Sequence, residues 1–183
     1  MMHRNLYGWV FPVLMILTLS ACQSVTNKPI RTVDLVDIKR FMGDWYVIAS
    51  IPTFLERNIF NAVESYRLEA NHIETTFKFR KGGFDGPLKT LRPKGFVRPQ
   101  TGNAVWDMQF VWPFKAEYRI IHLDDDYQTT IIGRSKRDYA WIMARSPVIS
   151  PAHYETMLNI LRAEGYDTTQ VKLVPHDLQE VES

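Results

Sequence analysis

Residues 106–112, WDMQFVW, alternate between large apolar and polar side chains, and this alternation decides the fold class of the chain. The apolar side chains occupy positions 106, 108, 110 and 112, and Asp107 and Gln109 lie between the first three of them. Successive side chains of a β-strand point to opposite faces of a sheet, so the pattern predicts a strand with one buried face.

The same alternation recurs along most of the chain and predicts an all-β fold. Turn residues such as Gly82-Gly83 and Asn103 separate the apolar segments. The eight predicted strands cover residues 43–51, 61–69, 72–81, 88–98, 103–112, 116–123, 127–133 and 138–145. Such a series favours a closed antiparallel up-and-down β-barrel, because closure leaves no unpaired sheet edge. A β-sandwich fits the same periodicity, so it stays open at this point.

One α-helix is predicted after the eighth strand, packed on the outside of the barrel. Ser150 is a suitable N-cap, Pro151 suits the first helical position, and Gly165 suits the end of the helix. Residues 140–144 offer an outward apolar seat, and residues 171–174 predict a closing ninth strand. The apolar stripe of the helix consists of Tyr154, Met157, Leu158 and Leu161.

The first 21 residues differ in composition from the rest of the chain and predict a signal peptide. Arg4 is followed by an uncharged stretch of 14 residues from Leu6 to Leu19. A helix of that length reaches only ~21 Å, which is short of a bilayer core of about 30 Å. The stretch therefore predicts a secretory signal over residues 1–21 rather than a membrane span.

The cysteine after this signal, Cys22, predicts attachment to lipid. Residues 19–22, LSAC, resemble the lipobox of bacterial lipoproteins, and Cys22 is the only cysteine of the chain. The resemblance implies cleavage before Cys22, acylation of its thiol and an outer-membrane location facing the periplasm. Residues 22–32 then form a lipidated tether, for which several acyl chains give a stable anchor. An ordinary signal followed by an incidental cysteine stays open.

Three motifs, in order along the chain, resemble the signatures of the lipocalin family. Residues 39–46, KRFMGDWY, resemble the first signature, and residues 125–127 resemble the second with an aspartate in place of its threonine. Arg145 resembles the third signature, and the resemblance implies that it stacks on a tryptophan at the closed end of the barrel. The structural signature residues are Gly43, Trp45, Asp126, Tyr127 and Arg145.

The chain is most similar in its motifs to the bacterial lipocalins, which are outer-membrane lipoproteins. Residues 54–57, 112–114 and 137–142 carry this likeness. It implies a barrel domain over residues 33–175, followed by a polar tail over residues 176–183.

The lipocalin resemblance also implies which side chains face the barrel interior and contact a ligand. An apolar, aromatic lining with tyrosine hydroxyls suits an acyl chain. The alternative, that these bulky groups fill the barrel as a core, stays open. The expected interior contacts are Tyr66, Phe77, Phe79, Met108, Phe110, Trp112, Tyr118, Tyr139 and Trp141.

The connections at the open end of the predicted barrel are rich in basic residues. Residues 52–60, 80–89, 113–117 and 133–138 contain eight Lys or Arg and four Asp or Glu, a difference of +4. A basic rim above an apolar well suits an anionic head group, so we expect a fatty acid or a lysophospholipid. The basic residues expected to bind its head group are Arg134, Lys136 and Arg137.

The composition argues against nucleic-acid binding and catalysis. The formal net charge is only +2, without any Lys/Arg run. The histidines have no metal-ligand spacing, and no nucleophile motif occurs, so we expect neither metal nor cofactor. The sequence predicts a non-enzymatic lipid carrier of the cell envelope, with a role in envelope maintenance or stress. An enzyme using Glu64 and His122, an envelope scaffold, and a homodimer all stay open.

Overall fold

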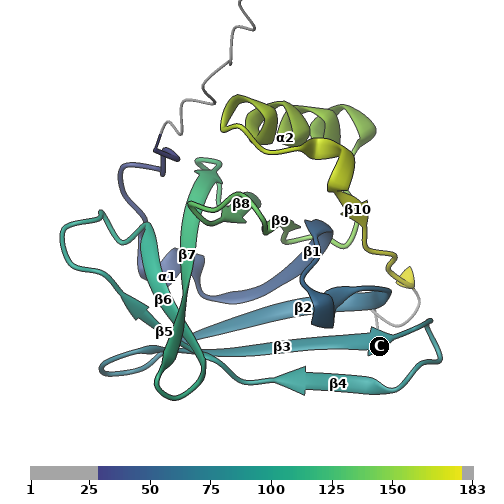
Figure 1. Ribbon diagram of the computed structural model, residues 1–183, viewed down its shortest axis with the longest axis horizontal. Helices are drawn as coiled ribbons and strands as arrows, with labels where there is room; N and C mark the ends of the chain where they lie inside the picture. Colours follow the sequence, from purple (N-terminus) through teal and green to yellow (C-terminus); the bar gives the residue numbers. More distant parts are fainter. Residues whose placement is uncertain (1–28, 179–183) are drawn as a thin grey trace, which may run out of the picture.

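The computed structural model describes residues 29–178 of the chain (Figure 1). The predicted signal peptide, Cys22 and the last five residues lie outside this range. Within these residues, two α-helices, two short 3-10 helices and ten strands follow each other. The strands are β1 Gly43–Ile51, β2 Ile59–Leu68, β3 Ile73–Lys81, β4 Leu88–Leu91, β5 Lys94–Val97, β6 Val105–Val111, β7 Phe114–Leu123, β8 Thr129–Gly133, β9 Ala140–Ala144 and β10 Lys172–Leu173.

The strands form one antiparallel sheet that closes on itself as a barrel. Each strand pairs with the next barrel strand, and β9 pairs with β1, with Tyr46 opposite Ala144 and Ile51 opposite Ala140. The two short strands β4 and β5 both pair with β3 and together take the place of one barrel strand. The predicted eight-stranded up-and-down barrel is therefore confirmed, and the β-sandwich is excluded.

Two predicted strand boundaries are wrong. The segment 88–98 is interrupted at Arg92-Pro93, because proline has no N–H to give to the ladder. The Pro93 carbonyl instead accepts hydrogen bonds from both the backbone N (3.2 Å) and the hydroxyl (2.7 Å) of Thr75. The predicted loop 113–117 is almost entirely strand, because β6 turns into β7 over Trp112-Pro113 alone, with Val111 opposite Phe114.

The strand β10 does not close the barrel, contrary to the sequence prediction. Closure belongs to β9, while β10 pairs with Ala49 and Ser50 on the other edge of β1. The β1–β2 pairing ends at Tyr46 and Val63, so the second half of β1 has a free edge on that side. The segment β10 covers this edge.

The predicted outer helix is present as α2, Pro151–Ala163, lying along one side of the barrel (Figure 1). The Ser150 hydroxyl accepts a hydrogen bond from the His153 N–H at 3.2 Å, and Gly165 follows the helix with φ +83°. Met157 and Leu161 are buried in the interface between the helix and the barrel. Their partners on the outer face of the barrel include Ile121, Ile131, Ala140, Ile142 and Ala144.

The packed part of the chain is longer than the predicted range 33–175. Ile30 is buried against the outer cluster, and Arg31 forms an ion pair with Glu164 at 2.8 Å. After β10, the His176 ring nitrogen lies 3.0 Å from the Val47 carbonyl oxygen.

The closed end of the barrel is built around Trp45 and Arg145. Trp45 is fully buried, and its indole N–H donates to the Phe41 carbonyl at 2.9 Å. The short helix α1, Ile38–Phe41, covers this end from outside. The Arg145 guanidinium carbon lies 3.8 Å from the centroid of the Trp45 ring, the stack that the signature predicts. The carbonyls that accept hydrogen bonds from Arg145 belong to Arg40, Phe41, Met42, Asp44 and Tyr127.

The other signature residues surround this arginine. The Tyr127 hydroxyl accepts from the Asp37 N–H at 2.8 Å, and the Arg40 guanidinium lies 4.0 Å from its ring centroid. Gly43 has φ +94°, and a Cβ there would lie 3.3 Å from Arg145 Nη1. Asp126 is exposed in the β7–β8 turn. Tyr127 and Arg145 thus hold the segment that contains α1 against the barrel floor.

We expect Arg145→Ala to lower the free energy of unfolding by about 3 kcal/mol, because it leaves several carbonyls without a donor and removes a cation–π contact. Arg145→Lys should fall between wild type and Ala, since an ammonium cannot reproduce the planar fork. Urea unfolding measures both. Arg162→Ala, which removes an exposed ion pair with Glu155, is the control and should cost less than about 1 kcal/mol.

Candidate ligand-binding site

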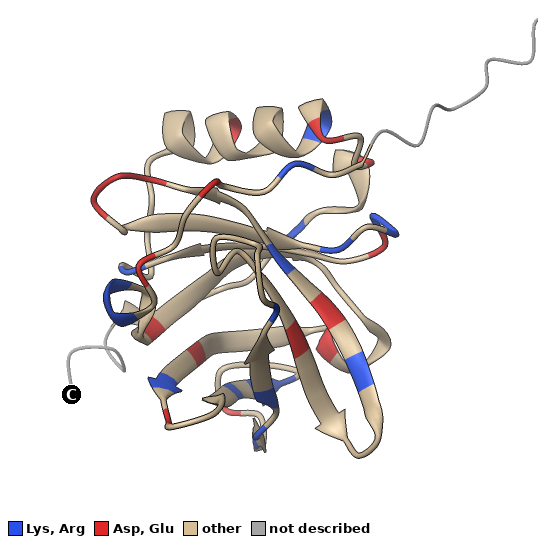
Figure 2. Cartoon of the chain, turned by 90° about the vertical axis from the view of Figure 1, so that its left-hand side faces the viewer, with Lys and Arg blue, Asp and Glu red and all other residues tan. Residues whose placement is uncertain are grey.

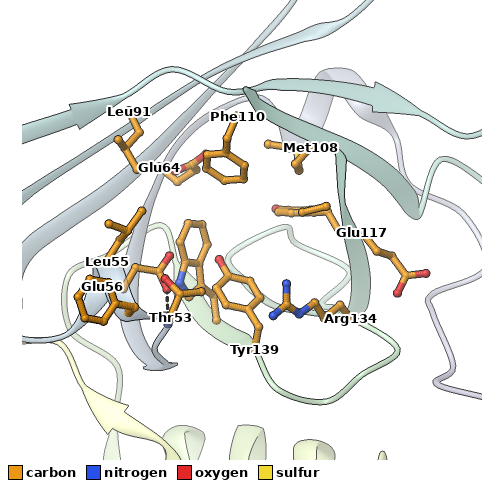
Figure 3. A pocket seen from close by; sticks show the side chains of 14 residues that line it. Thr53, Leu55, Glu56, Glu64, Leu91, Met108, Phe110, Glu117, Arg134 and Tyr139 are labelled. Atoms are coloured by element: carbon orange, nitrogen blue, oxygen red, sulfur yellow. Dashed lines mark hydrogen bonds between the residues drawn. The ribbon is translucent and has the colours of Figure 1, made fainter. Parts of the chain in front are cut away.

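A cavity of about 320 Å³ opens at the end of the barrel opposite Trp45. This volume is at the lower end of the range for small-molecule sites, about 300–1,000 Å³. The side chains around it come from the β1–β2 connection, from β2, β4, β6, β7 and β9, and from the β8–β9 connection (Figure 3). The fourteen lining residues are Thr53, Phe54, Leu55, Glu56, Glu64, Leu91, Met108, Phe110, Ala116, Glu117, Tyr118, Arg134, Tyr139 and Trp141.

The barrel below this cavity is filled by aromatic side chains. The rings of Trp106 and Tyr118 stack with centroids 4.9 Å apart, and the hydroxyls of Tyr118 and Tyr66 lie 2.6 Å apart. Phe41 packs against Trp45 and Trp106 beneath them. The sequence left open whether the inward side chains line a ligand site or fill the barrel as a core. The closed half of the barrel is a solid core, and the open half holds a cavity.

The structure brings half of the predicted ligand-contact residues to this cavity. Figure 3 shows Met108 and Phe110 on one side of it, with Tyr139 and Arg134 facing them from the other. The six predicted residues that line the cavity are Met108, Phe110, Tyr118, Arg134, Tyr139 and Trp141.

Three other predicted residues are buried but do not line the cavity. Tyr66 belongs to the aromatic core described above. Phe77 packs between Phe79 and Trp141, with ring centroids 5.0 and 4.8 Å away. Phe79 lines a neighbouring surface depression beside Phe54. The predicted inward direction of all three is correct, but Tyr66 and Phe77 serve as packing beneath and behind the cavity.

The inward direction predicted for Trp112 is wrong, because the β6–β7 pairing shifts register between Met108 and Val111 and the chain then turns. Its side chain is 81% exposed. Arg137 is directed to the outer helix, where its Nε donates to the Glu164 carbonyl at 2.7 Å. Lys136 is exposed and lies outside the cavity lining. Of the three predicted head-group residues, only Arg134 therefore lines the cavity.

Glu64 places a buried carboxyl group in the cavity. The side chain is only 1% exposed, and its Oε2 has no hydrogen-bond partner among residues 29–178. Burial raises the pKa of Glu64 well above its ordinary value, and the nearby Glu56 raises it further, against a hydrogen bond with Thr75. Both effects favour the neutral acid, which is able to donate a hydrogen bond to a ligand.

Glu56 is a second buried carboxyl group, and sequence reasoning counted it only as a charge of the open end. It ends the 3-10 helix Phe54–Glu56, and its Oε2 accepts a hydrogen bond from the Thr53 N–H at 3.0 Å. Burial raises the pKa of Glu56, while the bonds from Thr53 and the charge of Arg134 oppose this shift. The T-x-x-E spacing of residues 53–56 was the available signal, since it is the pattern of a capping box.

The basic groups of the open end are mostly directed away from the cavity. Lys81 donates its ammonium to the Leu55 carbonyl at 3.0 Å, and the Lys115 ammonium lies 4.4 Å from the centroid of Phe96. Arg134, which is paired with Asp138, is the one Lys or Arg among the lining residues. The excess of +4 predicted for the open end is therefore not presented to the cavity.

Glu117 lies at the edge of the cavity as an ionised group. Burial raises the pKa of this carboxyl, but hydrogen bonds from the Ser135 N–H (2.7 Å) and the Arg119 guanidinium (2.8 Å) outweigh it, so the net shift is downward. On β7, Glu117 lies between Lys115 and Arg119, so acidic and basic positions alternate along that strand (Figure 2). The edge of the cavity thus carries both signs of charge.

The structure does not bring Glu64 and His122 together. His122 is outside the cavity lining, and the ionisable groups that act on its pKa are Asp124 and His153, the latter on α2. Within the described part of the chain, no cluster of three or more His, Cys, Asp or Glu side chains is arranged to hold a metal ion.

Comparison with known proteins agrees with this architecture. Residues 36–176 match the lipocalin-like domain family. The chain belongs to the lipocalin family. It is 28% identical over 151 residues to the outer membrane lipoprotein Blc of Escherichia coli, covering 82% of this chain and 85% of that protein. The predicted kinship with bacterial lipocalins is therefore confirmed.

More distant lipocalins show the same relationship. Temperature-induced lipocalin-1 of Arabidopsis thaliana is 27% identical over 162 residues, with 81% of this chain and 84% of that protein covered. The structure of insecticyanin from Manduca sexta superposes with a TM-score of 0.66 at 16% identity, covering 83% of this lipocalin and 87% of insecticyanin. At that identity the likeness establishes the fold alone.

Replacing Glu64 with glutamine should stabilise this lipocalin at neutral pH. Because the pKa of Glu64 is raised in the folded state, the folded chain holds a proton that the unfolded chain loses, and stability falls as pH rises above the unfolded pKa of about 4.3. Glu64→Gln removes this loss and should flatten the pH profile. Urea unfolding between acid and neutral pH measures it.

The control for this experiment is Glu155→Gln, which alters an exposed carboxylate on α2. It should leave the pH profile nearly as in wild type. A Glu64→Gln variant whose pH profile matched that of wild type would contradict a neutral Glu64.

Proposed function

We propose that this lipocalin binds a single-chain amphiphilic lipid, a fatty acid or a lysophospholipid, and carries it in the cell envelope. The observation that supports the proposal is the apolar cavity with Arg134 at its edge. The acyl chain would lie between Leu55, Leu91 and Met108, where it replaces contact with water by contact with apolar side chains.

The head group would lie at the edge of the cavity. The Arg134 guanidinium lies 5.6 Å from the centroid of Tyr139, so the ring restricts its position and leaves N–H groups for a carboxylate or phosphate. The ionised Glu117 is also at this edge. A zwitterionic head meets groups of both signs there, which favours a lysophospholipid over a fatty acid.

The small volume of the cavity limits the ligand. Since about 320 Å³ is near the minimum of ligand sites, one acyl chain fits the proposal better than two. The buried Glu64 sets a polar point in this space, on the same side as Phe110 and Leu91 (Figure 3).

We expect Arg134→Ala to weaken lysophospholipid binding about tenfold, because it removes the charge-assisted hydrogen bonds to the head group. Displacement of a fluorescent fatty acid by lysophospholipid measures the affinity. Lys136→Ala, which removes an equal charge outside the cavity lining, should change it less than about twofold. Equal losses for both variants would mean that charge in general, rather than Arg134, holds the head.

We propose further that Cys22 carries the lipid that anchors the chain to the outer membrane. The lipobox resemblance supports this, as does the relative whose name is outer membrane lipoprotein. Among residues 29–178, the structure has no helix of the length and apolarity needed to cross a membrane.

Cys22→Ser should abolish incorporation of labelled palmitate and leave residues 1–21 attached, because acylation of the thiol precedes cleavage in lipoprotein processing. Mass spectrometry of the intact chain measures both changes. Ser24→Ala, two residues further along, should be labelled and cleaved as in wild type. Cleavage of Cys22→Ser at the same site would indicate an ordinary signal peptide.

A further inference from the structure

Seven large apolar side chains around the open end of the barrel are more than half exposed, and we call them the apolar rim. Trp112 and Phe54 are 81% and 79% exposed, the highest values in this group. An apolar patch of this extent on a chain surface marks an interaction site. The apolar rim consists of Phe54, Leu55, Leu88, Phe110, Val111, Trp112 and Phe114.

The apolar rim is continuous with the cavity. Phe54, Leu55 and Phe110 line the cavity and are exposed at the same time. Trp112 lies in the turn between β6 and β7, where Val111 and Phe114 face each other across the hairpin. Whatever covers the rim is therefore in contact with the entrance of the ligand site.

Basic side chains accompany the apolar rim. Residues 52–60, 80–89, 113–117 and 133–138 surround the open end. Their exposed charged side chains are four basic and two acidic, a difference of +2. Aromatic side chains among basic ones are typical of segments that lie at the interface of a lipid bilayer. The basic residues are Arg57, Lys89, Lys115 and Lys136, and the acidic ones are Asp85 and Asp138.

The described chain begins on the side of this open end. Arg31 is paired with Glu164, and the Glu164 carbonyl accepts from Arg137 in the β8–β9 connection. Residues 22–28 lie between Cys22 and the first described residue, and seven residues reach at most about 25 Å. An anchor on Cys22, as proposed above, would keep the apolar rim close to the membrane surface.

We propose that the apolar rim docks onto the surface of a phospholipid bilayer that contains anionic lipids. In this pose the aromatic side chains enter the interface, the basic residues meet the lipid phosphates, and the cavity opens directly toward the acyl chains. A ligand then passes between bilayer and barrel without crossing water. Two copies docked rim to rim would instead bring their basic residues together, so the charge favours the bilayer over a second copy.

Trp112 is a natural reporter for this docking. Of the five tryptophans of the chain, Trp45, Trp106 and Trp141 are buried in the barrel, and Trp9 lies in the predicted signal peptide. The chain from position 22 onward, with Cys22→Ser so that no acyl chain anchors it, is mixed with vesicles of phosphatidylcholine, with or without phosphatidylglycerol, whose acyl chains are brominated. We expect the bromine to quench Trp112 emission, more strongly with phosphatidylglycerol and less strongly at high salt. Trp112→Phe identifies the quenched signal.

The double variant Val111→Ser, Phe114→Ser tests the apolar rim itself. It should lower vesicle partitioning on the order of tenfold, because two exposed side chains lose their apolar surface. The matched control is Leu35→Ser, Val148→Ser, which changes two exposed apolar residues, 72% and 56%, away from the open end. Partitioning of the control should match wild type, and circular dichroism checks that both variants fold.

Two results would overturn the proposal. One is Trp112 emission that brominated lipids leave unchanged. The other is a dimer in analytical ultracentrifugation that the rim variant abolishes and vesicles do not dissociate, which would assign the rim to a second copy. Lysophospholipid displacement in solution is measured for the same variants. A rim variant that no longer docks on vesicles but still binds lysophospholipid shows that the rim acts apart from the ligand site. A failure to bind lysophospholipid, with docking unchanged, would count against the proposed function and not against the docking.

Discussion

The contact between Arg145 and Trp45 joins β9, the last barrel strand, to β1, the first, at the closed end of the barrel. Arg145 follows β9, the last barrel strand, and its guanidinium bonds to carbonyls of α1 and of the start of β1 while stacking on Trp45. Because β9 also pairs with β1, this contact closes the barrel and seals its floor at the same place. The floor is sealed at this end, and the cavity opens at the opposite end of the barrel.

The aromatic core above this floor decides how much of the barrel is left for a ligand. Trp106, Tyr118 and Tyr66 occupy the closed half, and the cavity begins above Tyr118. Glu64 lies at this boundary with an unpaired oxygen, in surroundings that favour its neutral form. The cost of a polar group without a partner is high in a low-dielectric interior. The neutral form lowers this cost, because a protonated carboxyl is easier to bury than a carboxylate.

The cavity and the exposed surface around it differ in the charged groups that they present. The interior of the cavity holds acids whose burial opposes ionisation, and a single guanidinium at its edge. The exposed surface around it combines aromatic tips with basic side chains. The proposed ligand and the proposed bilayer contact use these two regions separately, the first for a head group and chain, the second for a lipid surface.

The sequence by itself determined the all-β class, most strand positions, the outer helix with its caps, and the family motifs. These depend on local periodicity and on residue types such as Ser150 and Gly165, which act within a few positions along the chain. It did not determine which side chains reach the cavity. The register shift before Val111 turns Trp112 outward, and a hydrogen bond to the Glu164 carbonyl directs Arg137 to the outer helix. The fold of the β1–β2 connection places Glu56 in the cavity lining, where its side chain is buried. Each of these depends on contacts between strands or segments far apart in sequence, so only the tertiary structure decided them.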